Sequence, residues 1–411
     1  MPPNPREDPA VSCAMMNQDG DCGPCPGDRA ERIVFFELPP VPVHCNVLWD
    51  SRAAALAAPA APVRLAYFPD CGLIYNVLFD ESLTRYRATY ENALHFSPRF
   101  RKYAEELADR LVERYGIRDK NVIEIGCGDG HFLALLCDRG GNRGMGFDPG
   151  HDPGRAATAR VGAMQILAEP YTARHAHYPV DLLACRHVLE HIGNPCAFLA
   201  GLSEPLRRHG APVVYMEVPN ALYTLRDMGV WDIIYEHCSY FTPASLPVLM
   251  QRAGFEVLRV AEAYGGQFLG VEARPAADPS AGDDARAAAD DARAVRDLVD
   301  RFAEHYRAKR DQWAAALERL APGEAVVWGA GSKGVMFLNA LAVATERIEY
   351  VVDVNPRKTG KHVPGTGQEI VRPDALRRIA PRTVILMNPL YRAEVERSLA
   401  ELGVVAEVRA A

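Results

Sequence analysis

The sequence predicts an α/β protein in which two parallel-sheet halves follow a small β-rich N-terminal module. Short buried strands alternate with helices from "NVIEIG" to "APVVYMEVPN", and the alternation resumes at "AVVWGAGSKG". Each alternation opens with a strand followed by a glycine-rich turn, "VIEIGCGDGHF" in the first half and "VVWGAGSKG" in the second. This pattern is typical of a parallel sheet with helices on both faces, so we expect two Rossmann-like halves.

Bulk composition excludes several classes of protein. The 411 residues are 48% hydrophobic and 24% charged, which fits a soluble chain of two or three domains. The formal charge of −7 argues against a general nucleic-acid binder. No apolar run approaches the roughly 18 residues that span a bilayer. The start "MPPNPREDPAV" lacks the features of a signal peptide. We therefore expect a cytoplasmic protein with reduced thiols, some of its ten cysteines being candidate metal ligands.

The domain boundaries follow from composition and periodicity. Apolar runs such as "RIVFFEL" and "RLAYF" predict the small β-rich module, and "EARPAADPSAGD" predicts a linker before a long amphipathic helix. The predicted parts are the N-terminal module at 1–80, the first Rossmann-like domain at 81–275, the linker and long helix at 276–322, and the second Rossmann-like domain at 323–411.

A clear helix opens the first Rossmann-like domain. In "SPRFRKYAEELADRLVERYG", Ser97 is the predicted N-cap and Pro98 stands at the first helical position. Apolar residues then recur at helical spacing until Gly116, which predicts the helix end.

The first glycine-rich turn predicts a ligand site. Gly126, Gly128 and Gly130 follow a buried strand, and glycine lets the backbone approach a ligand closely. Asp148 ends the next strand, where an acid can accept both hydrogen bonds of a ribose diol. A dinucleotide site would favour G-x-G-x-x-G, but this turn reads G-x-G-x-G with Glu124 before it. The alternative is a turn without a ligand.

The second glycine-rich turn predicts an anion site. Gly329, Gly331, Ser332 and Lys333 open a helix, whose N-terminal N–H groups favour anions, and Lys333 adds a positive charge. Asp353 follows the next strand and is a candidate for holding a ribose. The alternatives are a bound dinucleotide, or glycines that serve only close packing.

The stretch "IIYEHCSYFT", 233–242, carries the candidate catalytic groups. It follows the strand "VVYMEVPN", and ligands lie beyond the carboxyl ends of such strands. Histidine suits a general base because its pKa lies near the working pH. We predict His237 as the base, Glu236 as a group that orients it or contacts substrate, and Tyr235 as a phenol donor. The alternative for His237 is a core histidine satisfied by a backbone carbonyl.

Two segments resemble class I S-adenosylmethionine (SAM) methyltransferases. The "E-x-G-x-G-x-G" pattern of "VIEIGCGDG" resembles their motif I, and "ACRHVLEHI" is similar to a segment after their fourth strand. Glu190 and His191 within it are expected to cap or pack the following helix. The SAM-binding residues that this resemblance implies are Glu124, Gly126, Gly128, Gly130, Asp148 and His187.

The whole chain resembles three-domain C-methyltransferases that act on nucleotide-linked keto-sugars. The segments that carry this resemblance are "CGPC…PDCGLIYN", "IEIGCGDG…FDP", "YEHCSYFTP" and "VVWGAGSKG…YVVDVNPRKTGKHVPGT". The family architecture implies a small zinc-binding N-terminal module, a class I SAM domain and a C-terminal Rossmann-like domain. The implied activity is SAM-dependent C-methylation, through an enolate, of a nucleotide-linked keto-sugar or a similar activated small molecule in secondary or deoxysugar metabolism. The second glycine-rich turn would then hold the diphosphate of the sugar nucleotide.

The implied chemistry assigns one more residue. Methylation beside a ketone needs a base and a donor to the enolate oxygen, and a neutral phenol is a strong donor. Tyr90 in "TYENALHFSP" matches the position of an active-site tyrosine of the family. The alternatives are an O- or N-methyltransferase of the same architecture, a nicotinamide-dependent oxidoreductase, and a SAM-binding scaffold protein.

The sequence departs from the family pattern at three points. Phe68 stands where the second C-x-x-C pair of the zinc module needs a cysteine, Ile234 stands where the family typically has a tyrosine, and "LMNPLYRAEV" replaces a Trp-Asn segment. A closed structural zinc site needs four ligands. The candidate zinc ligands are Cys22, Cys25 and Cys71, with His44 or Cys45 as substitutes for the missing cysteine.

Overall fold

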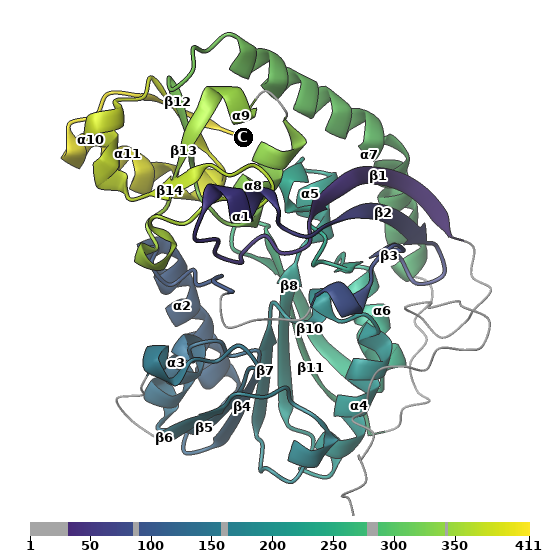
Figure 1. The fold of residues 1–411 in the computed structure, drawn as a ribbon. Helices are drawn as coiled ribbons and strands as arrows, with labels where there is room; N and C mark the ends of the chain where they lie inside the picture. Colours follow the sequence, from purple (N-terminus) through teal and green to yellow (C-terminus); the bar gives the residue numbers. More distant parts are fainter. Residues whose placement is uncertain (1–31, 85–89, 158–162, 278–286, 342–343) are drawn as a thin grey trace, which may run out of the picture.

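Three sheets organise the computed structural model of the chain (Figure 1). The structure describes residues 32–84, 90–157, 163–277, 287–341 and 344–411, so Cys22 and Cys25 lie outside the described residues. A four-stranded sheet belongs to the N-terminal module, a seven-stranded sheet to the central part and a five-stranded sheet to the C-terminal part. The predicted fold class, two α/β halves behind a β-rich module, is confirmed.

The seven-stranded sheet has the order β10-β11-β8-β7-β4-β5-β6. All neighbours from β8 to β6 are parallel, whereas β11 runs antiparallel to both β8 and β10. From β4 the chain adds β5 and β6 on one side of the sheet and then β7 and β8 on the other, so β4 and β7 form a topological switch point. Ligands bind beyond the carboxyl ends of the strands at such a point. The strands are β4 (Asn121–Ile125), β5 (Arg143–Phe147), β6 (Ala163–Leu167), β7 (Leu182–Arg186), β8 (Val213–Pro219), β10 (Phe255–Ala263) and β11 (Phe268–Pro275). The helices of this part are α2 (Pro98–Tyr115), α3 (His131–Gly140), α4 (Pro195–Arg207), α5 (Ala221–Leu225) and α6 (Ser245–Arg252).

Local signals place the predicted first helix correctly. The Ser97 hydroxyl accepts the Phe100 N–H at 3.3 Å, and Gly116 ends α2 in the left-handed region at φ 62°. The hairpin of β10 and β11 was not predicted. Because β11 continues to Pro275, the first residues of the predicted linker belong to a strand.

The C-terminal sheet is entirely parallel, in the order β14-β13-β12-β15-β16. Its strands are β12 (Ala325–Trp328), β13 (Ile348–Val352), β14 (Glu369–Val371), β15 (Thr383–Leu386) and β16 (Glu407–Ala410). Its helices are α8 (Ser332–Ala340), α9 (Ala344–Arg347), α10 (Leu376–Ile379) and α11 (Arg392–Leu402). The long helix α7 (Ala287–Glu318) precedes this sheet, as the amphipathic pattern predicts.

The N-terminal module is built into the rest of the molecule. It contains β1 (Ile33–Pro42), α1 (Arg52–Leu56), β2 (Ala60–Phe68) and β3 (Leu73–Asn76), and its fourth strand is β9 (Ser239–Tyr240) from the stretch "IIYEHCSYFT". Phe36 of β1 packs edge-on against Phe302 and Tyr306 of α7, with ring centroids 5.0 and 4.7 Å apart. One apolar core joins this module to α7 and the C-terminal sheet, and Figure 1 shows them together on one side of the seven-stranded sheet.

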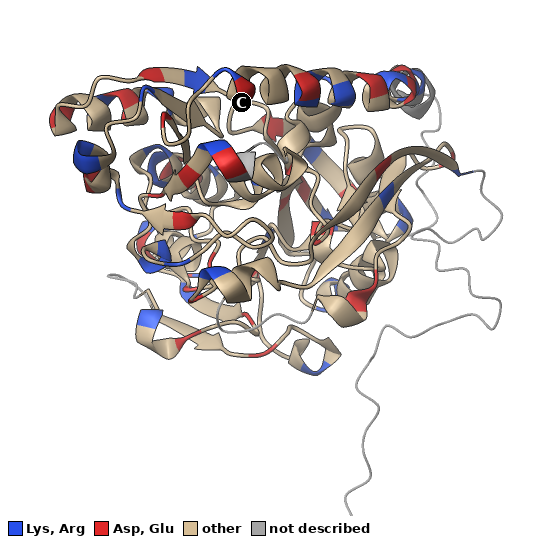
Figure 2. Ribbon diagram, turned by 45° about the horizontal axis from the view of Figure 1, so that its top comes forward, with Lys and Arg blue, Asp and Glu red and all other residues tan. Residues whose placement is uncertain are grey.

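Charged residues of both signs are interspersed over the helices and strands (Figure 2). Along α7, acidic and basic residues alternate on the exposed side rather than forming a stripe of one sign. Among the described helices, none combines the length and the apolar character that crossing a bilayer requires.

Candidate active site

The first glycine-rich turn connects β4 to α3 and forms an open cradle. A Cβ on Gly126 would come within 2.2 Å of the Val188 side chain, so no larger residue fits there. At Gly128, φ is 54° and a Cβ would meet nothing within 4 Å, so the space beside it is open. Asp148 accepts the Gly128 N–H through Oδ2 and the Gly150 N–H through Oδ1, both at 2.8 Å. Asp148, the residue predicted to bind the ribose, therefore also fixes the conformation of the turn.

Glu124 is a buried acid with an unsatisfied oxygen beside this cradle. The residue is 3% exposed, and its Oε2 has no hydrogen-bond partner among the described residues. Burial raises the pKa of Glu124 to about 8, although Arg186 opposes the shift. A buried carboxyl group with one unsatisfied oxygen, next to an open glycine turn, suits a ligand with positive charge. The residues present therefore fit SAM, whose sulfonium and amino groups are cationic.

We predict that Glu124 makes stability fall as pH rises. An acid whose folded pKa is about 8 and whose ordinary pKa is 4.5 binds more protons in the folded state between these values. Between about pH 5.5 and 8.5, ionisation of Glu124 should cost ligand-free protein about 3 kcal/mol of unfolding free energy, in addition to the loss that comes from His187. Glu124→Gln should remove the part due to Glu124 and keep the part due to His187. Urea unfolding at the two pH values measures it, and an equal loss in the variant would contradict the prediction.

A buried ionic network lies at the ends of β7 and β8. Arg186 donates to Glu217 Oε1 from Nε at 3.0 Å and from Nη2 at 2.8 Å, and its guanidinium stands 4.3 Å from the Phe132 ring centroid. Glu217 Oε2 accepts hydrogen bonds from the hydroxyls of Tyr103 and Tyr215. This network was not predicted, although the charged residues at the ends of the apolar strands β7 and β8 indicate a buried ion pair.

His187 belongs to the same network. It follows β7 in the left-handed region, at φ 55°, which is uncommon for a side chain with a Cβ. Its Nε2 lies 3.1 Å from Glu217 Oε1 and its Nδ1 lies 3.6 Å from Glu190 Oε1. Burial would lower the pKa of His187, but Glu190 and Glu217 raise it to about 9. The structure thus places the predicted SAM contact between two carboxylates, beside the cofactor turn, as a cation at neutral pH.

The second predicted histidine, His237, faces another histidine. Its ring centroid lies 4.9 Å from that of His191, nearly perpendicular to it. His191 Nδ1 is 3.0 Å from the Glu236 carbonyl, and Asn194 rather than His191 caps the following helix α4. The expected capping role is therefore wrong, and the packing role stays a prediction. Burial, and after it the positive charges of His191, His187 and Lys333, lower the pKa of His237 well below its usual value. His237 is therefore a neutral imidazole at pH 7.

The expected role of Glu236 in orienting His237 is wrong. Glu236 Oε1 lies 3.1 Å from His44 Nδ1, and Oε2 accepts the Cys45 N–H at 2.9 Å. The buried carboxylate thus orients His44, a residue of the N-terminal module that sequence analysis considered only as a zinc ligand. Residues 192 positions apart form this pair, so no local pattern revealed it.

The two predicted phenols occupy different environments. Tyr90 forms an isolated bridge with Val47, its hydroxyl lies 3.4 Å from Asn46 Nδ2, and its ring centroid is 6.2 Å from that of His44. The Tyr235 hydroxyl instead accepts the Asp80 N–H at 2.8 Å and stands 3.4 Å from the Leu78 carbonyl. Because these backbone groups engage the buried Tyr235, we assign it a structural role, and Tyr90 remains the phenol candidate.

The C-terminal part reaches the cofactor turn directly. Arg357 of the "DVNPRK" segment donates from Nη1 to Asp129 Oδ2 at 2.6 Å, within the turn "GCGDG". The same Nη1 lies 3.2 Å from Glu91 Oε2, and Asn355 Nδ2 lies 3.0 Å from Glu91 Oε1. Glu91 is buried and directly follows Tyr90. This contact therefore holds the phenol candidate, the cofactor turn and the C-terminal part together.

The second glycine-rich turn repeats the geometry of the first. Asp353 Oδ2 accepts the Ala330 N–H and Oδ1 accepts the Asn355 N–H, both at 2.8 Å, as Asp148 does in the other half. Gly331 precedes α8 without a side-chain cap, and a Cβ on it would meet nothing within 4 Å. Lys333 Nζ donates to Asp232 Oδ1 at 2.6 Å, so its charge is already paired. The structure places the remaining predicted residues, Gly329 and Ser332, on either side of Gly331 in this turn.

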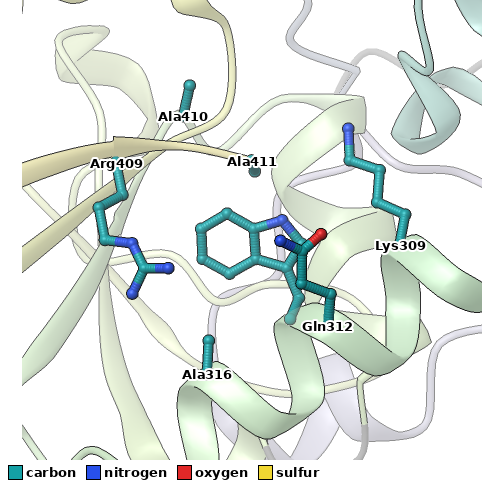
Figure 3. Close-up of a pocket in the computed structure, with 7 residues that line it drawn as sticks. Lys309, Gln312, Ala316, Arg409, Ala410 and Ala411 are labelled. Atoms are coloured by element: carbon teal, nitrogen blue, oxygen red, sulfur yellow. The ribbon is translucent and has the colours of Figure 1, made fainter.

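Among the described residues, Cys71 takes part in no zinc-type cluster, and a hollow between α7 and β16 is not lined by the predicted site residues. Cys71 is buried with its thiol 3.9 Å from the Phe68 carbonyl, and no metal-type cluster of described residues contains it. A hollow between α7 and β16 (Figure 3) is lined by Lys309, Trp313 and Arg409, with a volume of about 230 Å³. It contains none of the predicted site residues.

Comparison with known proteins decides the class of the enzyme. Residues 98–260 match the model of a family described as "Methyltransferase domain", and residues 264–405 match that of the "C-methyltransferase C-terminal domain". The chain is a multidomain SAM-dependent C-methyltransferase. The two matches confirm the predicted SAM-dependent C-methyltransferase and its cofactor, SAM, and they favour methyl transfer over the oxidoreductase alternative. The zinc module and the keto-sugar substrate stay predictions.

Several known proteins resemble this C-methyltransferase over part of its length. The C-methyltransferase NovU of Streptomyces niveus is 27% identical over 309 residues, which are 72% of this chain and 72% of NovU. The ubiquinone biosynthesis O-methyltransferase of Saccharophagus degradans is 25% identical over 170 residues, 36% of this chain and 69% of that enzyme. The solved magnesium protoporphyrin IX methyltransferase of Synechocystis, with bound SAH, is 16% identical, covers 43% of this chain and 84% of its own, and aligns with a TM-score of 0.33.

Proposed function

We propose that this C-methyltransferase methylates a carbon beside the ketone of a nucleotide-linked keto-sugar, or of a similar activated small molecule, in secondary or deoxysugar metabolism. The observation that carries the proposal is a chain of contacts that links these groups. Tyr90 lies beside His44, which pairs with Glu236 next to His237 in the chain. Glu91, which follows Tyr90, is joined through Arg357 to Asp129 of the cofactor turn. The printed description of NovU as a C-methyltransferase, with a likeness that spans most of both chains, supports carbon as the methylated atom.

The proposed reaction uses a base, an enolate donor and an electrophilic methyl group. Neutral His237 takes the proton from the carbon beside the ketone, and the electron pair of that C–H bond forms the enolate. The Tyr90 hydroxyl donates a hydrogen bond to the enolate oxygen, which stabilises the developing charge. SAM supplies the methyl group, so a C–C bond forms as the S–CH₃ bond breaks. Glu124, Gly128 and Asp148 are the residues that would hold SAM in line with the carbanion.

The C-terminal turn is proposed to bind the nucleotide part of the substrate. The N–H groups at the start of α8 favour a diphosphate, and the contact of Arg357 with Asp129 brings this part of the chain to the cofactor turn. Lys333 would have to exchange Asp232 for the phosphate. Ile234, buried where the family typically has a tyrosine, leaves the phenol role to Tyr90.

A mass-spectrometric screen tests the proposed function. The enzyme is incubated with SAM and a panel of nucleotide-linked keto-sugars, first in H₂O and then in D₂O. We expect a product heavier by one methylene and, in D₂O, exchange of the proton beside the ketone. If no keto-sugar gains a methyl group or exchanges its proton, the proposal is wrong.

Tyr90→Phe separates C-methylation from the alternative of O- or N-methylation. Loss of the enolate donor should lower turnover of a keto-sugar by about 10²–10³-fold, as removal of one oxyanion donor does elsewhere. An O- or N-methyltransferase has no enolate and should keep most of its turnover. Steady-state kinetics measure the change, and Tyr350→Phe is the control because Tyr350 lies beside Arg378 rather than beside His44.

A further inference from the structure

Three side chains, one of them the proposed base, form a compact donor cluster. One carboxylate oxygen of Glu190 and one ring nitrogen each of His191 and His237 all lie within 4.8 Å of one another. Glu190 and His191 belong to the short helical turn after β7, and His237 belongs to the segment after β8. The Glu190 carbonyl accepts the Cys238 N–H at 2.9 Å, so the backbone holds the two segments together.

Among the described residues, one oxygen of this carboxylate, Oε2, lacks a hydrogen-bond partner, whereas the other, Glu190 Oε1, lies 3.6 Å from His187 Nδ1. Glu190 is 1% exposed. Leaving a buried carboxylate oxygen unsatisfied costs stability, because the oxygen has lost its hydrogen bonds to water. A cation bound between the carboxylate and the two imidazoles would satisfy this oxygen.

One imidazole is oriented as in metal sites. A carbonyl oxygen only accepts, so the contact of His191 Nδ1 with the Glu236 carbonyl places a proton on Nδ1 and leaves Nε2 as the nitrogen that can offer a lone pair. Metal-ligating histidines are usually fixed in this way, by a bond from the nitrogen that does not bind the metal.

We propose that Glu190, His191 and His237 form a binding site for one borderline divalent cation such as Zn²⁺ or Co²⁺. Two nitrogens and one oxygen with an open fourth position match the ligand set of non-structural zinc sites. At metal–ligand distances of about 2.0–2.2 Å, tetrahedral ligands lie about 3.4 Å apart, so donors that now lie within 4.8 Å of one another would have to close by at most about 1.4 Å through side-chain rotation.

Occupation of this site would inhibit methyl transfer. A cation that takes the lone pair of His237 leaves the proposed base unable to accept the substrate proton. This consequence rests on the proposed function, whereas cation binding does not. The site is separate from the cysteines of the predicted zinc module, since all three of its ligands offer nitrogen or oxygen.

Cobalt titration of the full chain tests the site. We expect visible absorption bands of one bound Co²⁺ without the intense near-ultraviolet bands that thiolate ligands give, and displacement by Zn²⁺ should abolish them. Glu190→Gln and His191→Asn should each weaken binding at least about tenfold. His305→Asn is the control, because His305 is an exposed histidine of α7, outside the cluster. Retained SAM binding shows that each variant is folded.

Several outcomes would overturn the proposal. Visible bands that persist unchanged in both variants, bands of thiolate type only, or no cobalt binding at all would each contradict the site. The inhibition has a separate readout. Zn²⁺ should lower turnover, and a chelator should restore it. In Glu190→Gln, the turnover with Zn²⁺ divided by the turnover with chelator should approach one. Cobalt binding without inhibition would support the site and contradict His237 as the base.

Discussion

Replacing His237 by asparagine is expected to lower methyl transfer by about 10²–10⁴-fold, the usual contribution of a positioned general base. The amide keeps a polar group of similar size but cannot take a proton from carbon. SAM affinity should change little, because the residues assigned to SAM are Glu124 and the glycine turn and not His237. Steady-state turnover and calorimetric SAM binding, measured on the same preparation, check both parts.

Hydrogen exchange at the substrate carbon sharpens this prediction. Proton removal precedes methyl transfer, so the wild-type enzyme should exchange the proton beside the ketone in D₂O even when SAH replaces SAM. The asparagine variant should lose this exchange in proportion to its turnover. His305→Asn, on the exposed side of α7, is the matched control. A variant that retains near-normal turnover and exchange would show that His237 is not the base.

The parts of the fold that local physics determines were predictable. Ser97, Pro98 and Gly116 mark the ends of α2 because caps act within one turn of their own position. The strand before each glycine-rich turn was predictable because a buried parallel strand reads as an apolar run. The β10–β11 hairpin was missed because its exposed strand β10 has little apolar continuity.

The site was predictable only in part, for a different reason. Gly126, Gly128 and Asp148 lie in one local motif, and the structure brings them together. The partner of Glu236 is His44, 192 residues away, and the partner of Asp129 is Arg357, 228 residues away. Such pairs depend on how the N-terminal module and the C-terminal part pack on the central sheet, and one sequence carries no local sign of that packing.

The ionic network of Arg186 and Glu217 leads to the largest expected effect on stability. Glu217→Gln should lower the free energy of unfolding by about 3–5 kcal/mol, because it leaves Arg186 and His187 buried without their carboxylate. Chemical denaturation measures the loss. The matched control is Glu204→Gln: Glu204 is 64% exposed and pairs with Arg208, 72% exposed, so its loss should stay below about 1 kcal/mol.

The pH dependence of this loss follows from the two ends of the network. Burial would raise the pKa of Glu217, but Arg186 and His187 hold it far below its ordinary 4.5, so its contribution is present above about pH 4.5 and is lost as pH falls below that. The pKa of His187 is raised from 6.5 to about 9, so its contribution is complete below pH 6.5 and is lost as pH rises through 9. The difference between wild type and Glu217→Gln should therefore be largest between about pH 5 and 6.5 and should shrink on both sides. A difference that is constant from acid to alkaline pH would mean that packing, and not charge, accounts for the stability that Glu217 contributes.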